Sequence, residues 1–332
     1  MLLESAAGAL SLPVLLLLAL LLDAAFGDPH LVFRFVPHPV ALLGGLTGWF
    51  DRRLNRAQRS VASRTLRGLV VVVLMVLLAA AAGWLIADLA GRWRYGWVIE
   101  LAVVTLLIAQ RSLFDHVRAV ARALERDGLE GGRAAVAHIV GRDPARLDGH
   151  GVARAAIESL AENFADGVTA PVFWYLLLGL PGLVACKAIN TMDSMIGHRT
   201  PEHAAFGRAA ARLDDAMNFL PARIAGVMIV AAALFAPSGR PWQAFRIMAR
   251  DGRRHRSPNA GWPEAAMAGA LSVALSGPRS YDGAASDEPW LGEEFPARIG
   301  PVEIRRALYL FAVACFVNFV VVAGIAWFFL AP

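Results

Sequence analysis

The sequence predicts an all-α, polytopic integral membrane protein, on the evidence of its composition, its apolar runs and the placement of its basic residues. Of 332 residues, 57% are hydrophobic and only 18% are charged, unlike an average soluble domain. The apolar residues are gathered in runs instead of amphipathic patterns. The net charge of +5 lies mainly in loops beside these runs, which favours membrane topology and anionic lipid over nucleic acid as its cause.

Five uncharged runs are candidates for membrane helices, and they lie at residues 5–22, 68–87, 167–186, 224–239 and 307–330. A bilayer core about 30 Å thick takes about 20 helical residues, so 68–87 and 307–330 are long enough and 224–239 is short. Residues 97–110 are a weaker candidate because Glu100 interrupts them. We take 5–22 as a first helix and not a secretory signal, because the residues before it hold Glu4 and no Lys or Arg.

Basic residues beside the apolar runs indicate the topology. Residues 51–67 carry six Arg against one acid, and the positive-inside tendency places them in the cytoplasm. Two spans joined by 88–96 return the chain to that side, so 111–166 is predicted to be a cytoplasmic helical insert. We expect breaks in this insert at Gly131-Gly132 and at Asp143-Pro144.

Two alternatives are open for the chain after residue 166. Residues 238–256 are basic again and should be cytoplasmic. Two simple crossings, at 167–186 and 224–239, satisfy this and leave 187–223 outside. Alternatively, Gly179-Leu180-Pro181-Gly182 divides the first of these runs into two half-helices that return to the same side.

Residues 257–278 are predicted to form a further helix. Pro263 suits its first turn and Gly277-Pro278 its stop, and the small residues at 265–270 suit close helix packing. Residues 279–300 are polar and rich in Gly and Pro, so we expect a loop there.

Four polar clusters interrupt the apolar sequence and form the candidate site. The first runs from Asp23 to His30, includes Asp28, and is followed by His38-Pro39. A Gly before an Asp-Pro step predicts a tight turn at the end of the first helix. A helix stop with solvated side chains is an equally simple explanation of this cluster.

The second cluster holds Glu158, Glu162, Asn163 and Asp166. On a helix its three carboxylates are four residues apart and share a face, where they repel each other unless cations or Arg lie between them. Magnesium, bound by carboxylates together with substrate phosphates, is one resolution. Pairing with Arg of the insert is the alternative.

The third cluster follows the run at 167–186 directly. Lys187, Asn190 and Ser194 are spaced to share a helical face, with Asp193 adjacent, and Lys187 is the only lysine among 32 basic residues. A charge deep in the membrane costs about 2.5 to 3.5 kcal/mol on insertion scales, so such ions are usually functional. The alternative is an interfacial lysine whose ammonium reaches water.

The fourth cluster combines both signs of charge. Its members are Arg208, Arg212, Asp214, Asp215, Asn218 and Arg223. Adjacent Arg and Asp side chains suit a phosphate and its metal ion, and they suit an ion-pair lattice at the membrane surface equally well. The sequence contains no Gly-x-x-x-x-Gly-Lys-Ser/Thr loop and no His-Glu-x-x-His helix. The spacing alone therefore predicts a polar site near one membrane face, able to bind an anionic substrate.

In order, the clusters resemble those of the CobD/CbiB family of cobalamin-biosynthesis membrane proteins, the adenosylcobinamide-phosphate synthases. The resembling segments are FGDPH and HPV within 26–40, RSL at 111–113, GRD at 141–143, ESLAENFADGVTAP at 158–171, KAINTMDSMIGH at 187–198, FGRAAARLDDAMNFLPAR at 206–223 and SPNAGWPEAAMAGAL at 257–271. Each segment alone is weak evidence, whereas the ordered set is specific. The resemblance implies one membrane domain over 1–332 in the bacterial inner membrane, with the active site facing the cytoplasm.

The resemblance also implies an activity. The free propionate of adenosylcobyric acid is joined to aminopropanol phosphate, or to aminopropanol, in an ATP-dependent amide ligation that gives adenosylcobinamide phosphate. ATP and magnesium are the implied cofactors, the corrinoid is a substrate, and other late corrin-pathway enzymes are candidate partners.

On this hypothesis the cluster residues acquire roles. Magnesium ligation or proton transfer is assigned to Glu158, Glu162, Asp166, Asp214 and Asp215, with Glu162, Asp214 and Asp215 as the metal set. Phosphate binding is assigned to Lys187, Arg208, Arg212 and Arg223. Positioning of the corrin amides or the amine is assigned to Asn163, Asn190, Asp193, Ser194, Ser257 and Asn259. Further substrate-binding candidates are Asp28, His38, Arg111 and Asn218.

Two other classes compete with this hypothesis. One is a non-enzymatic sensor or transporter, because signalling proteins of beta-lactamase regulation are distantly similar and a shared fold need not mean shared chemistry. A transporter should show repeated halves, and the sequence shows none. The other is a prenyltransferase with Asp-rich helices, suggested by residues 190–193 and Asp214-Asp215. The SPNAGW and GDPH segments favour the corrin family.

Overall fold

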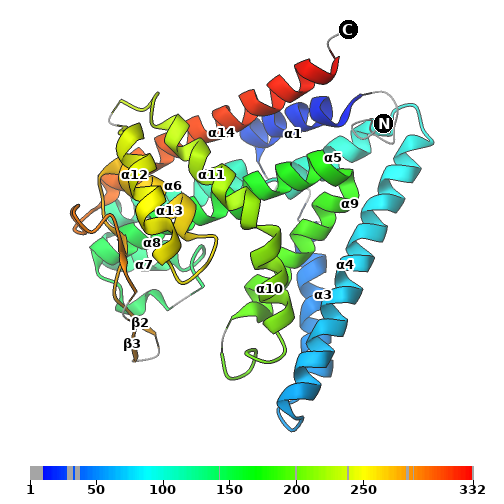
Figure 1. Cartoon of the computed structure of the whole chain (residues 1–332), viewed down its shortest axis with the longest axis horizontal. Helices are drawn as coiled ribbons and strands as arrows, with labels where there is room; N and C mark the ends of the chain where they lie inside the picture. The colour runs from blue at the N-terminus through cyan, green and yellow to red at the C-terminus, as the bar shows by residue number, and fades with distance from the viewer. Residues whose placement is uncertain are drawn as a thin grey trace. The chain divides into compact units, whose positions relative to one another are not determined.

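The computed structural model describes residues 10–27, 33, 38–141, 143–198, 200–237, 239–281, 284–286 and 288–330. Helices dominate these residues, which confirms the all-α prediction (Figure 1). The α-helices are α1 (Leu12–Phe26), α3 (Pro39–Leu54), α4 (Val61–Gly91), α5 (Trp97–Leu107), α6 (Gln110–Arg126), α7 (Gly128–Val136), α8 (Gly149–Phe164), α9 (Ala170–Met192), α10 (Arg208–Met217), α11 (Phe219–Ala232), α12 (Pro241–Asp251), α13 (Gly261–Leu271) and α14 (Pro301–Leu330).

The chain divides into two compact units. The first consists of Met1–Ala109, Ala170–Met217 and Val322–Pro332, and the second of Gln110–Thr169 and Asn218–Val321. In the first unit α4 packs along α9, as Figure 1 shows, and α1 packs against α5. The predicted insert, residues 111–166, lies wholly in the second unit, where α8 contacts α6, α7 and α13. The insert therefore shares its core with the later helices.

Several helices are long and apolar enough to cross a bilayer. Within the described part of the chain there are four such stretches, Val61–Gly91, Trp97–Arg126, Gly149–Gly197 and Pro301–Phe328. The pair Arg208–Met217 and Phe219–Ala232 is a fifth if the two helices form one broken span. By the length and composition of its helices the chain is a multi-pass membrane protein, as the apolar runs predict.

The surface of α4 shows why a bilayer is its natural surrounding. One side of this helix is buried in the first unit through Val71, Met75 and Ala79. Other positions, such as Leu74 and Leu77, leave large apolar side chains exposed. A continuous apolar surface of this kind is unfavourable in water and matches lipid chains.

The predicted interruption of the run at 167–186 is confirmed as a kink in α9. Gly179 has φ 64° and ψ −154°, a backbone conformation that residues with a Cβ rarely adopt, and Pro181 follows it. Because Pro181 has no N–H, the helical hydrogen-bond ladder is weakened at the same place. The kink agrees with both alternatives for this segment, a bent crossing and a re-entrant pair.

Two predicted element boundaries are wrong. Gly131-Gly132 lies inside α7, and the break comes earlier, at Gly128 with φ 69°. The paired glycines lie within the short helix, where Gly132 packs beside the Leu124 side chain. Helix α13 ends at Leu271 and not at Gly277, because Ser272 adopts the left-handed conformation that caps it. The predicted break at Asp143-Pro144 is confirmed, since the Asp143 side chain caps a short 3₁₀ turn there.

The segment expected to be a loop, residues 279–300, contains short strands. Strand β1 (Leu275–Ser276) pairs with β4 (Trp290–Leu291), and β2 (Arg279–Tyr281) pairs with β3 (Ala284–Ser286), both antiparallel. Strands this short carry little period-two signal in sequence. The β1–β4 pair packs against α13, so it extends the core of the second unit.

A close backbone approach holds α10 and its preceding segment against α4. Phe206 is fully buried in a cluster with Val71 and Met75, and a Cβ added at Gly68 would overlap the carbonyl oxygen of Phe206. Only hydrogen on the Gly68 Cα leaves room for that carbonyl. Gly68 of α4 thereby fixes the position of Phe206-Gly207, which precedes α10 and lies more than a hundred residues later in the sequence.

We therefore expect Gly68→Ala to lower the free energy of unfolding by about 1 to 3 kcal/mol, the range of overpacking substitutions. Reversible denaturation in mixed micelles measures it. Gly324→Ala in α14 is the matched control, because a Cβ there meets no atom within 4 Å, and it should cause no loss. Equal stabilities of the two variants would contradict the close approach.

Candidate functional site

The predicted site residues are divided between the two units. The first unit holds His38, Lys187, Asn190, Asp193, Ser194, Arg208, Arg212, Asp214 and Asp215. The second holds Arg111, Glu158, Glu162, Asn163, Asp166, Asn218, Arg223, Ser257 and Asn259. Asp28 lies outside the described residues. The tentative magnesium set of Glu162, Asp214 and Asp215 draws on both units, and it stays a prediction.

In the first unit, the polar residues begin on the last turns of α9. Lys187 is buried, with 8% of its surface exposed, among apolar neighbours in the helix. Thr191 Oγ1 donates to the Lys187 carbonyl over 2.7 Å, and Ser194 Oγ donates to the Asn190 carbonyl over 2.9 Å. The hydroxyls thus bond back to the preceding turn, and the α-helix opens there into a π-turn, η3 (Asp193–Gly197).

Helix α10 places its aspartates beside this π-turn. Asp214 is buried, Asp215 is half-buried, and Asp215 lies near enough to Asp193 for their charges to interact. The Trp174 Nε1–H donates to the Met217 carbonyl over 3.2 Å and joins the end of α10 to α9. Carboxylates from η3 and α10 therefore gather in one region of the first unit.

Two of the three arginines predicted in the fourth cluster, Arg208 and Arg212, lie at the surface of α10. Arg208 and Arg212 are exposed, whereas Asp214 on the same helix is buried. A buried ammonium on α9, carboxylates on η3 and α10, and exposed guanidinium groups form a mixed-charge set. Such a set suits a phosphorylated substrate together with a cation that the carboxylates bind.

His38 has a local structural role, since its ring accepts a hydrogen bond from the Val40 N–H at the start of α3.

The three carboxylates of the second cluster lie in two different elements. Glu158 and Glu162 lie on α8, but Asp166 lies in a second π-turn, η2 (Ala165–Thr169). A π-turn has more residues per turn than an α-helix, so Asp166 does not simply continue the regular helix, and the common face of the three carboxylates stays a prediction. Their surroundings also differ, because Glu158 is buried, Glu162 exposed and Asp166 half-buried. Asn163 donates to the Ser159 carbonyl at 2.9 Å.

The SPNAGW segment is built around Arg223. The Arg223 guanidinium donates to the Asn259 side-chain oxygen at 2.8 Å and to the Pro258 carbonyl at 3.1 Å. Its carbon lies 3.7 Å from the centre of the Phe219 ring and 4.7 Å from that of Trp262, an arrangement typical of cation–π contacts. The guanidinium therefore holds this segment in shape.

Ser257 shapes the other end of this segment. Its Oγ accepts hydrogen bonds from the N–H groups of Asn259 and Ala260, which closes a tight turn before α13. The Ser257 N–H in turn donates to the His255 ring over 3.1 Å. His255 Nε2 is 3.8 Å from Glu264, a buried carboxylate on the first turn of α13.

Sequence reasoning missed several buried acids of the second unit. Glu264 and Glu288 are buried, and Arg256 lies 3.7 Å from Glu288. Glu158, a residue that the sequence did predict, accepts a hydrogen bond of 2.7 Å from the backbone N–H of Ser276, a non-glycine residue with φ 61°. Glu264 is the one charge between residues 257 and 278, and an isolated acid among small apolar residues was the available signal.

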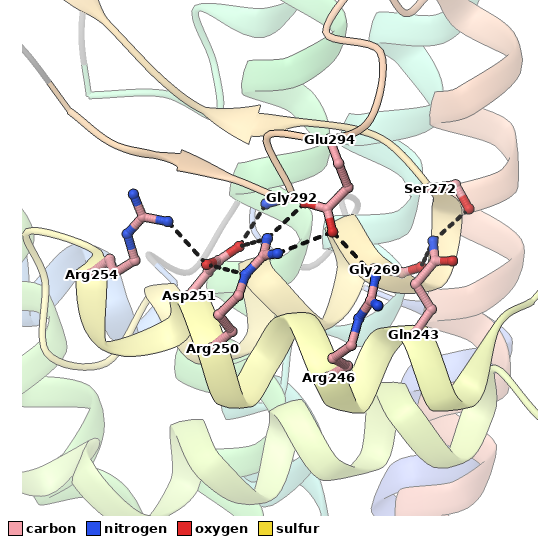
Figure 2. A network of polar contacts seen from close by, with 9 residues as sticks. All are labelled: Gln243, Arg246, Arg250, Asp251, Arg254, Gly269, Ser272, Gly292 and Glu294. Carbon is pink, nitrogen blue, oxygen red and sulfur yellow. Dashed lines mark hydrogen bonds and ion pairs between the residues drawn. The ribbon is translucent and has the colours of Figure 1, made fainter.

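A network of hydrogen bonds and ion pairs surrounds Asp251 in the second unit (Figure 2). The Asp251 carboxylate is fully buried, and it accepts two hydrogen bonds from Arg250, at 2.8 and 2.7 Å. Arg254 donates to it at 3.2 Å and the Gly292 N–H at 2.9 Å. Arg250 also reaches Glu294, at 2.7 Å. One carboxylate thereby joins the end of α12 to the segment that follows β4.

The electrostatics of this network follow from its contacts. Burial alone would raise the pKa of Asp251, but the hydrogen bonds from Arg250 and Gly292 outweigh it, so the pKa lies below its ordinary value. The hydrogen bond from Arg250 likewise lowers the pKa of Glu294. Figure 2 also shows Gln243 of α12 donating to the Gly269 carbonyl and to Ser272 Oγ, at 3.1 and 2.8 Å. Because their pKa values are lowered, the carboxyls of Asp251 and Glu294 are ionised at neutral pH.

Known proteins match this chain over most of its length. The family model described as CobD/Cbib protein matches residues 16–311, which include every segment from FGDPH to SPNAGW. The chain belongs to the CobD/CbiB family. A cobalamin biosynthesis protein CobD of Sinorhizobium sp is 48% identical over 304 residues, covering 91% of this chain and 94% of that protein.

Other CobD proteins are similarly close. The CobD of Brucella suis biovar 1 is 48% identical over 302 residues, covering 90% of this chain and 92% of that protein. The CobD of Rhodobacter capsulatus is 46% identical over 304 residues, with coverages of 90% and 92%. No solved structure matches the chain significantly. The resemblance drawn from the sequence is confirmed, and membership of the CobD/CbiB family supports a role in cobalamin biosynthesis.

We expect Asp251→Asn to lower the free energy of unfolding by about 1.5 to 3 kcal/mol, the range for hydrogen bonds to charged groups. The amide cannot accept from Arg250, Arg254 and Gly292 as the carboxylate does. Denaturation in mixed micelles measures the change. Asp115→Asn is the matched control, because Asp115 makes an exposed i,i+4 pair with Arg111, and it should change stability by less than about 1 kcal/mol.

Acid should destabilise the second unit through the same carboxyls. Both folded pKa values are lowered, so the stabilisation is present above the unfolded values of about 4 and is lost as pH falls through the folded ones. The midpoint temperature of thermal unfolding of the wild type should therefore fall below about pH 4. The shift should be smaller for a double variant, Asp251→Asn with Glu294→Gln, and parallel pH profiles would contradict this origin.

Proposed function

We propose that the chain is an ATP-dependent amide ligase that joins the free propionate of adenosylcobyric acid to aminopropanol phosphate, or to aminopropanol, giving adenosylcobinamide phosphate. Membership of the CobD/CbiB family supports the pathway. The observation that supports the chemistry is the first-unit set, in which buried Lys187 and the acids of η3 and α10 belong to contacting elements. A ligase for anionic substrates needs both signs of charge.

The proposed reaction has two steps. The propionate oxygen attacks the γ-phosphorus of ATP, the bond to the bridging oxygen breaks, and ADP leaves, which gives an acyl phosphate. The amine nitrogen then attacks the acyl carbon, the carbon–oxygen bond to phosphate breaks, and the amide and inorganic phosphate form. The ammonium of the amine must first lose a proton to a base. The activation is required because a carboxylate is a poor acyl donor to an amine.

In the first unit, Lys187, Arg208 and Arg212 are proposed to bind phosphate oxygens. Magnesium would reduce the phosphate charge during transfer, and an all-oxygen donor set is the kind that this ion prefers. Asp214 and Asp215 supply such donors within the first unit, and the assignment of Glu162 to the same ion stays a prediction from the sequence. Asp193, near Asp215, is proposed as the base that takes the ammonium proton.

The second unit is proposed to position the corrin ring and its amide side chains. Asn163 and Asn259 carry amide groups that pair with amides, and Ser257 lies in the same segment as Asn259. The contacts of Arg223 with Pro258 and Asn259 favour a positioning role beside its proposed phosphate role. We propose that the site faces the cytoplasm across a bacterial inner membrane, because ATP is a cytoplasmic substrate.

The test is ligase activity of the purified full chain in detergent, with adenosylcobyric acid, aminopropanol phosphate, ATP and magnesium, followed by chromatography of the corrinoid product. Lys187→Met and Asp214→Asn should each lower kcat/KM by about a hundredfold or more, within the range of acid–base and electrostatic groups. Methionine retains the length of the lysine stem, so packing around position 187 is largely preserved.

Asp88→Asn is the control, because Asp88 lies near the end of α4 in an exposed pair with Arg92. It should retain the wild-type rate. Wild-type rates in folded Lys187→Met and Asp214→Asn would refute the site assignment. The ligase proposal itself fails if the wild-type chain cannot restore cobinamide formation to a bacterium that lacks this step.

A further inference from the structure

Three ligand-bearing side chains outside the proposed ligase residues converge in the first unit. Asp51, Glu202 and His203 each place one ligand atom within 4.8 Å of the other two. Asp51 lies on the last turn of α3, and the other two lie in the segment between η3 and α10. The segment is far from α3 in sequence, so this convergence is a product of the fold and no local motif indicated it.

The surroundings of Asp51 aim one of its oxygens at the histidine. Asn55 donates to Asp51 Oδ1 over 2.9 Å, and Arg64 Nε donates to the Asn55 side-chain oxygen over 2.9 Å. The other oxygen, Oδ2, lies 3.3 Å from His203 Nε2. One carboxylate oxygen is thereby held by a hydrogen bond while the second is directed into the cluster, which is typical of a supported metal ligand.

His203 is oriented from its other side by Thr200. Thr200 Oγ1 accepts from the His203 backbone N–H at 3.2 Å and lies 3.3 Å from the ring Nδ1. When Nδ1–H donates to this hydroxyl, Nε2 carries its lone pair toward Asp51 Oδ2. Two lone pairs at this separation repel unless a cation or a proton lies between them.

Glu202 is placed by its main chain. Its carbonyl oxygen accepts from Asn55 Nδ2 at 3.1 Å and from the Arg64 guanidinium. Its side chain is exposed, and the side chains of Asp51 and His203 retain 19% and 16% of their exposure. The cluster is therefore held from the protein side and accessible to solvent on the other, which leaves room for water ligands.

We propose that Asp51, Glu202 and His203 bind a divalent cation of the zinc class, with water completing the coordination. One imidazole nitrogen and two carboxylate oxygens suit Zn²⁺, whereas Mg²⁺ prefers oxygen donors. The cation joins the segment before α10 to the end of α3. This site is separate from the magnesium that the ligase proposal needs, and it stands if that proposal fails.

The test uses the full chain without an affinity tag, purified in detergent and stripped with a chelator. Zn²⁺ is titrated against a chromophoric competitor, and Co²⁺ is added separately to record its visible absorption bands. We expect one equivalent per chain. His203→Ala and Glu202→Gln should each weaken Zn²⁺ binding by at least about tenfold, and Thr200→Val by about tenfold to a hundredfold through the orienting contact.

His116→Ala is the matched control, because His116 lies exposed on α6 and should bind no part of this ion. Glu202→Gln keeps the backbone contacts of Glu202, so it distinguishes loss of a ligand from loss of the fold. A wild-type chain that binds less than one equivalent overturns the proposal, as do variants that bind like wild type. In that case a proton between His203 and Asp51 explains the geometry.

Discussion

The architecture of the second unit depends on placing the buried carboxylates of Asp251 and Glu158 in contact with groups that replace water. The Asp251 carboxylate has no exposed surface, and two guanidinium groups and a backbone N–H surround it. Glu158 is buried against the Ser276 N–H. An unpaired ion away from water is strongly unfavourable, so these contacts determine which segments must meet. In the second unit they join α12 and α8 to the strand pair that follows α13.

Motifs of the candidate site coincide with irregular helices. The ENFADG and NTMDSMIG segments each include a π-turn, and α9 is kinked at Gly179 between them. A regular helix satisfies its own backbone groups and directs its side chains at fixed intervals. A π-turn changes that interval and re-aims the polar residues that follow it. The acids at positions 166 and 193 are placed by such turns.

Much of the fold could be predicted because its signals are local. Long apolar runs gave the spanning helices, the Gly-Leu-Pro-Gly step gave the kink, and Pro263 marked the first turn of α13. Features that depend on distant contacts could not be predicted. The close approach of Gly68 to Phe206 and the network of Asp251 with Gly292 join positions far apart in sequence. Single-sequence patterns carry no record of such pairs.

The candidate site divides in the same way. The ordered motifs identified the family and named the polar residues of both units, whereas η2 separated Asp166 from the helix of Glu158 and Glu162. The convergence of His203 with Asp51 had no local signal, because the two residues belong to unrelated stretches of sequence. The sequence therefore predicts which residues carry the chemistry, but not which distant residues the fold brings together into one site.

The single lysine supports the view that position 187 has a chemical role. Every other basic residue among the 32 is Arg, so the composition of this chain strongly favours Arg wherever a positive charge suffices. Arg carries five N–H donors and stays charged, and burying it requires partners for most of them. A lysine ammonium is compact, carries three donors and can change protonation when desolvated. Lys187, the one lysine, lies at a buried position on α9. There a compact ammonium that can change protonation has an advantage over a guanidinium.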